Sequence, residues 1–301
     1  MTTEQRRTET TGVLFAGGAY VWWGLVAAYF KLIRHVPPLE ILAHRIVWSV
    51  AMLVLLVFVT ARGRAIARIL GDRRTLLFLL GSTLLVATNW LVFIIAVTTD
   101  RLLDASLGYF INPIVSVFLG FVVLRERLRP LEWVSVALSA SAVALLTIRA
   151  GIFPWIAVTL ALSFGLYGLL RKLARAGAIE GLFVETVILL PAAAVYLFFL
   201  SARGRLVFGA GSVTTDLLLI AAGPITALPL VWFAAGVQRL RLATIGLLQY
   251  VSPTMQFVLA VVLFREPFQG TRVFAFILIW VAVALYTIAN LRQRGSVEPI
   301  V

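Results

Sequence analysis

The chain alternates long apolar runs with short polar interruptions along almost its whole length. A helix needs about 20 apolar residues to cross a hydrocarbon core of roughly 30 Å, and it bonds its own backbone polar groups while doing so. We therefore predict an all-α polytopic membrane protein with ten transmembrane helices. The predicted spans are residues 12–33, 39–60, 75–97, 104–124, 130–148, 152–170, 181–200, 215–236, 243–263 and 271–290.

The composition agrees with this pattern, because 61% of the 301 residues are hydrophobic and only 13% are charged. Soluble domains are far more polar. The first apolar run, residues 12–33, is too long for the apolar region of a signal peptide, so we expect an uncleaved first span. The absence of cysteine excludes disulfides, cysteine-ligated metal and thiol catalysis. We expect no cofactor and no metal ion.

The net charge of +13 would suggest a nucleic-acid partner in a soluble chain. Here the basic residues lie between apolar runs, where they set topology and contact anionic lipid. We therefore expect the lipid bilayer, and no nucleic acid, as a partner. If the connections alternate between two sides, most lysines and arginines fall on the side of the two tails. The positive-inside rule then places both termini in the cytoplasm.

An internal repeat relates the two halves of the chain, residues 1–149 and 150–301. Short matches recur 140 residues apart: Pro113 and Pro253, Arg125-Glu126 and Arg265-Glu266, and Thr147-Ile148 and Thr287-Ile288. Each half holds five predicted spans, so the second half has to insert upside down relative to the first. The connection after the fourth span carries more arginine in the first half than in the second, as inversion requires. Inverted repeats of this kind are typical of alternating-access transporters.

This tandem five-span arrangement, with an Arg-Glu turn after the fourth span of each half, resembles the EamA-type units of the drug/metabolite transporter superfamily. Within it, residues 18–49, 87–97, 105–128 and 247–266 are similar to the RarD family of permeases. The resemblance implies ten helices in two inverted EamA-type repeats. It also implies a bacterial inner membrane location and a family name linked to chloramphenicol sensitivity.

Three ionisable residues, Glu40, His44 and Arg45, lie together in the segment PPLEILAHRIVWS at the start of the second span. Glu40 and His44 are four residues apart and share a helix face, while Arg45 points about 100° further round. We expect the three residues to form one polar cluster in the outer third of this span. Arg45 lies roughly 10 Å along the helix axis, where an unpaired charge is costly. It is either part of a structural ion pair, or reaches back to the interface, or attracts an anionic group of a substrate.

Further candidate substrate-binding residues lie near the middle of other spans. Tyr20 and Trp23 form an aromatic stripe in the first span, which lipid contact alone could also explain. Prolines 113 and 253 free backbone carbonyls at matching positions of the two halves, which points to a transporter site or to plain packing kinks. The remaining candidates are Asn89, Trp90, Tyr109, Asn112, Gln249 and Tyr250.

Carboxylates within predicted spans are candidates for proton coupling, and Glu185 and Glu40 are the two that we identify. Either could instead neutralise Arg45 or Lys31. Glu126 and Glu266 lie at helix ends beside arginines. We interpret them as structural, with a gate across the repeat interface as the alternative.

Taken together, the sequence favours a secondary permease or exporter that moves a small metabolite or drug by alternating access. No phosphate-binding Gly-x-x-x-x-Gly-Lys-Ser/Thr loop occurs, so gradients have to supply the energy. The alternatives are a passive channel or scramblase-like protein and, less favoured, a membrane-embedded enzyme. The two histidines lack metalloprotease spacing and no paired aspartates lie within spans, so we expect no catalytic residues. The oligomeric state does not follow from the sequence.

Overall fold

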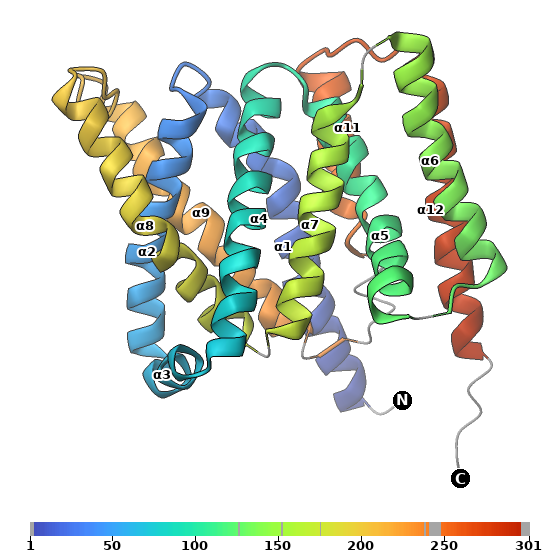
Figure 1. Ribbon diagram of the computed structural model, residues 1–301, viewed down its shortest axis with the longest axis horizontal. Coiled ribbons are helices and arrows are strands. Elements are labelled where there is room, and N and C mark those ends of the chain that lie inside the picture. The colour runs from blue at the N-terminus through green and yellow to red at the C-terminus, as the bar shows by residue number, and fades with distance from the viewer. Residues whose placement is uncertain are drawn as a thin grey trace.

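The computed structural model describes residues 3–125, 127–151, 153–174, 176–237, 239–240 and 248–295, and within these residues every regular element is a helix. The helices run side by side in one bundle (Figure 1). Their bounds are α1 Thr3–Leu32, α2 Pro38–Val59, α3 Gly63–Gly71, α4 Arg73–Thr98, α5 Leu102–Leu124, α6 Pro130–Ala150, α7 Trp155–Leu173, α8 Ala178–Ala202, α9 Val213–Val237, α11 Val251–Val258, the π-helical turn η1 Leu259–Leu263 and α12 Thr271–Gly295.

Nine helices in the described part of the chain are long and apolar enough to cross a membrane. They correspond to nine of the ten predicted spans, with ends that differ by a few residues. The tenth prediction, residues 243–263, begins outside the described residues; its described part is the shorter apolar helix over residues 251–263. The prediction of an all-α polytopic membrane protein is confirmed, while the number of ten helices stays a prediction.

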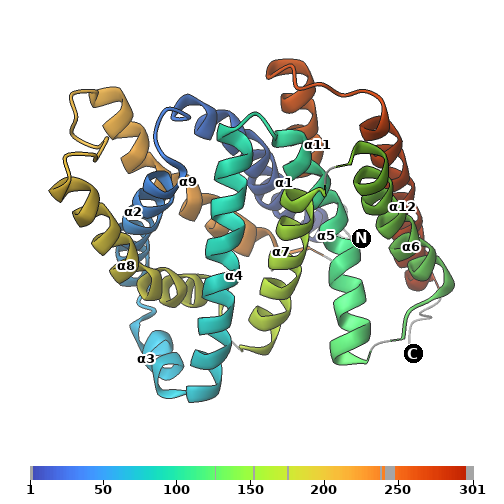
Figure 2. The ribbon, with the colours of Figure 1, turned by 45° about the horizontal axis from the view of Figure 1, so that its top comes forward.

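The short helix α3 was not predicted, because residues 61–74 carry too many arginines to read as a span. It is strongly amphipathic: Ile66 and Ile69 are buried, and arginines occupy the other side. A nine-residue helix cannot cross a bilayer, but it can lie across the end of a bundle with its isoleucines facing inward. Figures 1 and 2 show α3 in that position, between the ends of α2 and α4.

The bundle has two ends that matter for function. The start of α1, the helix α3 and the end of α12 lie at one end, which we call the α3 face (Figure 1). The turn between α4 and α5, which contains Asp100, and the loop between α8 and α9 lie at the other end, which we call the Asp100 face. Since α2 begins at the Asp100 face, Arg45 lies in the half of the bundle nearest that face.

Helix packing is closest where glycines replace larger side chains. α1 packs against α9 and α11, α7 against α4 and α5, α2 against α8 and α9, and α6 against α12. At Gly223 of α9, an added Cβ would collide with the backbone of Trp48 in α2. At Gly108 of α5, it would lie 2.7 Å from the Ala157 carbonyl oxygen of α7. These two contacts bring the backbones together and fix α2 and α5 against their neighbours.

Candidate functional site

The guanidinium of Arg45 lies among aromatic rings from three helices. Its central carbon is 4.2 Å from the Trp90 ring centroid of α4 and 5.5 Å from the Phe30 ring centroid of α1. Tyr29 and Tyr109 are close enough to interact with it electrostatically. The Nε atom is buried, and no described residue accepts a hydrogen bond from it. Arg45 and Trp90, which were predicted separately, are therefore in contact, Tyr109 lies within electrostatic range of the guanidinium, and the structure adds Tyr29 and Phe30.

Glu40 and His44 face a different neighbour, so the expected cluster with Arg45 is wrong. Glu40 Oε1 accepts hydrogen bonds from the backbone N–H groups of Val207, at 2.8 Å, and Phe208, at 3.2 Å. The His44 ring lies 4.8 Å from the Phe208 ring, and its Nδ1 accepts a bond from the Trp48 indole at 3.3 Å. The helical spacing that puts residues 40 and 44 on one face turns residue 45 away, and the loop before α9 covers that face. No ion pair of the described residues includes Arg45.

Asn89 connects three helices at the buried side of Tyr109. Its amide nitrogen donates to the Leu160 carbonyl at 3.1 Å and to Ser163 Oγ at 3.0 Å, both in α7. Its oxygen accepts from the Tyr109 hydroxyl of α5 at 3.0 Å. The buried amide that the sequence singled out therefore has protein partners, and its contact with the candidate site is made through Tyr109.

Asn112 lies three residues after Tyr109 on α5, beside Gly165 of α7. Its Oδ1 is buried and has no hydrogen-bond partner among the residues that the structure describes. Leaving a buried amide oxygen unpaired is costly in a membrane protein, where water does not replace the missing bond. Asn112 thus offers an unused acceptor one helical turn from Tyr109.

The other aromatic candidates form separate clusters. Tyr20 and Trp23 pack edge to face at a centroid distance of 5.5 Å, and both contact Phe233 of α9. Tyr250 stacks on Phe110 of α5 at 6.4 Å. Gln249 is half-buried beside Tyr250, just before α11.

The two prolines do not form matching breaks in the described residues. Pro113 lies inside α5, whereas Pro253 lies in the first turn of α11, where a backbone N–H would have no helical partner and its absence therefore costs nothing. The Pro253 carbonyl accepts a hydrogen bond from Ser106 Oγ of α5 at 2.8 Å. The local consequence is a direct polar link between α5 and α11.

Glu185 is fully buried in α8 and has partners from two other helices. Ser82 Oγ donates to its Oε1 at 2.5 Å, and the Tyr167 hydroxyl donates to its Oε2 at 3.3 Å. Arg171 Nε lies 3.8 Å from Oε1. Glu185 thus neutralises Arg171, not Arg45 or Lys31, and the role of Arg171 could not be inferred from its place in a basic helix end.

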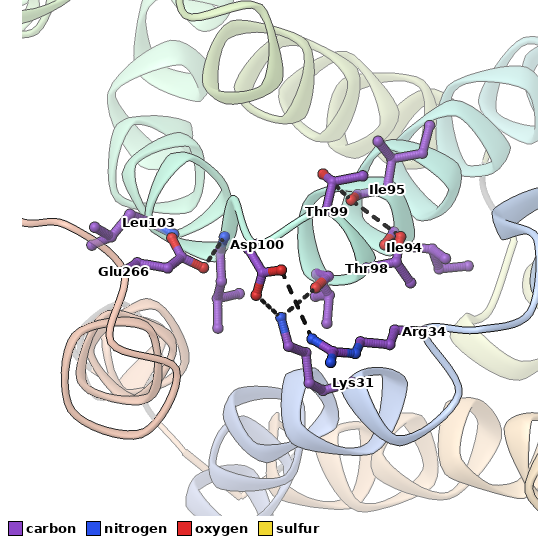
Figure 3. A network of polar contacts seen from close by, with 11 residues as sticks. Lys31, Arg34, Ile94, Ile95, Thr98, Thr99, Asp100, Leu103 and Glu266 are labelled. Carbon is purple, nitrogen blue, oxygen red and sulfur yellow. Dashed lines mark hydrogen bonds and ion pairs between the residues drawn. The ribbon is translucent and has the colours of Figure 1, made fainter.

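A polar network closes the Asp100 face (Figure 3). Lys31 of α1 pairs with Asp100 and also lies 3.4 Å from the Val97 carbonyl oxygen. Arg34 lies 3.9 Å from the same carboxylate. The Lys31 ammonium is 4.9 Å from the Phe264 ring centroid, next to η1. This network joins the end of α1 to the α4–α5 turn and to the segment after α11; the sequence drew attention to Lys31 but not to Asp100.

Glu266 binds the start of α5 from the far side of this network (Figure 3). Its two oxygens accept hydrogen bonds from the backbone N–H groups of Leu102, at 2.7 Å, and Leu103, at 2.9 Å. Burial raises the pKa of this carboxyl, and the two N–H donors offset part of that rise. The geometry is that of a helix cap supplied by another segment. Glu126, its repeat partner, lies outside the described residues.

A surface cleft of about 330 Å³ lies beside α3, between Arg68, Asp72 and Glu180. None of the predicted site residues lines it. At its rim, Arg62 and Glu180 form an ion pair at 2.7 Å, which links the end of α2 to the start of α8. A Thr75 hydrogen bond lowers the pKa of the Asp72 carboxyl at the start of α4.

A bundle of apolar spanning helices with buried polar groups between them is the architecture of a polytopic membrane protein. The model of the EamA-like transporter family matches residues 10–148. Protein RarD of Salmonella typhi is 43% identical over 91% of this chain and 94% of its own length. The chloramphenicol-sensitive protein RarD of Pseudomonas aeruginosa is 30% identical over 93% and 94%. The chain therefore belongs to the EamA-like transporter family and, within it, to the group of RarD proteins, as the sequence resemblance indicated.

A solved crystal structure of another protein supports the same fold. It superposes with a TM-score of 0.56, covers 94% of this chain and 99% of its own, and is 21% identical in sequence. At that level of identity the similarity concerns the fold alone.

Proposed function

We propose that the protein is a secondary permease of the bacterial inner membrane that moves a small metabolite or drug by alternating access. In this proposal residues 1–149 and 150–301 are inverted five-helix repeats, and both termini are cytoplasmic. The observation that carries it is the pairing of helices. In the repeat, the helices α1, α2, α4, α5 and α6 correspond to α7, α8, α9, α11 and α12, in that order. The contact of α1 with α9 then corresponds to that of α7 with α4, and the contact of α1 with α11 to that of α7 with α5. The contacts α2–α8, α5–α11 and α6–α12 map onto themselves.

The turns after α5 and after η1 support the same relation. Arg125 and Arg265, which are repeat partners, both adopt the left-handed backbone conformation, with φ of 56° and 54°. A residue with a Cβ rarely adopts this conformation, so its recurrence at matching positions favours a shared local structure. Inverted repeats of this kind allow one half to rock against the other around a fixed site.

The network at the Asp100 face supplies a gate for this mechanism. Lys31 and Glu266 tie α1, the α4–α5 turn and the segment after α11 together, and these belong to different halves. We interpret the arrangement as closed toward that face. Opening would exchange the Lys31 and Asp100 contacts for water, at modest cost because the Asp100 side chain is 57% exposed.

The residues proposed for the substrate path are Arg45, Trp90, Tyr109 and Asn112, flanked by Tyr20, Trp23, Gln249 and Tyr250. Asn89 positions Tyr109. For proton coupling we favour Glu185 over Glu40, because Glu185 is buried between spanning helices whereas Glu40 is bonded to a loop. A channel or scramblase-like protein is the competing class, and it would not need a gate that opens on one side at a time. The name of the Pseudomonas relative makes amphenicols suitable test ligands.

Accessibility from the two sides of the membrane tests this proposal. The chain contains no cysteine, so Asn112→Cys is a unique labelling position. We expect Asp100→Asn, which breaks the pair with Lys31, to speed labelling by a membrane-impermeant thiol reagent from the Asp100 face and to slow it from the α3 face. Sealed vesicles of both orientations measure the two rates. Leu84→Cys, at a side chain that is 69% exposed on α4, is the lipid-facing control. Faster labelling from both faces at once would indicate a channel.

A further inference from the structure

The positive charge of Arg45 has no negative partner in the described part of the chain. Four carboxylates form ion pairs with other lysines or arginines: Asp100, Asp104, Glu180 and Glu185. The others accept hydrogen bonds from backbone N–H groups: Glu40, Asp72, Glu132, Asp216 and Glu266. Each of these nine carboxylates therefore has a partner of its own, and none of those partners is Arg45.

A cation at this depth is costly to leave unpaired. Arg45 lies roughly 10 Å along α2 at 1.5 Å per residue, and such a charge costs a few kcal/mol or more within a bilayer. The Trp90 ring 4.2 Å away offsets part of that cost through its π face. The ring does not pair with Nε, which is buried and has no hydrogen-bond partner among the described residues.

The groups around Arg45 define what could complete it. Trp90 and Phe30 supply flat apolar walls. The Tyr109 hydroxyl donates its hydrogen bond to Asn89, and the Tyr29 hydroxyl donates to the Leu218 carbonyl oxygen. A planar carboxylate matches the guanidinium fork, and its single charge balances a single arginine. A phosphate dianion would bring an excess of negative charge. A neutral ligand would leave the arginine uncompensated.

From this accounting we infer that the substrate is a small organic monoanion, a carboxylate with a flat apolar body, whose charge completes Arg45 while Trp90 and Phe30 enclose the body. This substrate class rests on the proposed transport function. A ligand-binding role of Arg45 differs from a structural role in one measurable way. If the ligand supplies the partner, the empty protein carries an unpaired charge that it does not need for folding.

Ligand binding to purified protein in detergent tests the class of substrate. The probes are two pairs of similar shape, benzoate with benzamide and cyclohexanecarboxylate with its amide. A ligand that binds only the folded state raises the thermal midpoint. We expect at least one carboxylate to raise the midpoint of the wild type while its amide does not. Arg45→Gln should weaken that binding by about tenfold or more, and Arg45→Lys by less, since it keeps the charge without the fork. Arg272→Gln, which removes a charge at the Asp100 face, is the matched control and should bind as the wild type does.

The midpoint of the empty protein is the second measurement. Arg45→Gln should unfold at the same temperature as the wild type or higher, because it removes an unpaired charge. A lower midpoint or failure to fold would assign Arg45 a structural role and overturn the inference. So would equal stabilisation by an amide, unchanged binding in Arg45→Gln, or no stabilisation by either carboxylate.

Exchange in proteoliposomes separates this inference from the proposed function. If a bound carboxylate is not exchanged across the bilayer, the permease proposal fails, and the carboxylate remains only as the class of ligand that binds at Arg45. If the amides are exchanged and the carboxylates are not, the permease proposal holds and the substrate class fails.

Discussion

At the scale of single residues, we expect substitutions of two asparagines, Asn89 and Asn112, to have opposite effects on stability. Asn89 satisfies both ends of its side chain through Leu160, Ser163 and Tyr109. We expect Asn89→Leu to lower stability by about 1–3 kcal/mol, because it strands the Tyr109 hydroxyl and removes the link to α7. Asn112→Leu, which removes an oxygen that has no partner, should leave stability unchanged or raise it. Thermal denaturation in detergent compares the two. Equal losses would mean that Asn112 has a partner which the geometry does not reveal.

The residues around Arg45 illustrate what a sequence can and cannot specify at this scale. The helical period alone separates Arg45 from the face shared by Glu40 and His44. Which neighbours cover each face depends on segments up to 168 positions away, as the bond from Phe208 to Glu40 shows. Such a bond leaves no local pattern, because any backbone N–H can donate it.

At the scale of helices, a close backbone contact between α9 and α2 depends on one glycine, Gly223. We expect Gly223→Ala to lower stability by about 1–3 kcal/mol, because the new methyl group would meet the backbone of Trp48 and push α2 from α9. Gly168→Ala is the matched control: this glycine lies inside α7 with nothing near its Cβ position. There the higher helix propensity of alanine should raise stability by up to about 1 kcal/mol. Thermal midpoints that move the same way in both variants would contradict the close contact.

Helix prediction succeeded for the spans because a bilayer requires long uninterrupted apolar helices, which composition alone reveals. It failed for α3, because a short amphipathic helix with buried Ile66 and Ile69 is too polar to score as a span. The part of the predicted span at residues 243–247 lies outside the described residues. The two kinds of helix differ in what they require. A spanning helix has to be apolar along its whole length, whereas a helix packed at an interface has to be apolar on one face only.

At the scale of the whole molecule, the proposed inversion of the halves predicts the topology. Reporter fusions after residues 68 and 295, both at the α3 face, should report cytoplasm, and a fusion after residue 208 at the Asp100 face should report the outside. The excess of basic residues at the α3 face supports this orientation. An alkaline phosphatase and a fluorescent protein reporter at each position give opposite signals and control for expression. A cytoplasmic result at 208 would rule out the inverted second half.

The sequence by itself determined the class of protein, most of the spans and the family, because bilayer thickness and backbone bonding leave few solutions for a chain this apolar. It also indicated Arg45, Trp90 and Tyr109, since polar and aromatic groups are conspicuous in apolar runs. Only the tertiary structure decided the partners: Asp100 for Lys31, Arg171 for Glu185 and the loop at Val207 for Glu40. It also showed that Arg45 forms no ion pair with any of the described residues. Side-chain chemistry is local, but the pairing of charges depends on which helices come to lie side by side, and that follows from packing across the whole bundle.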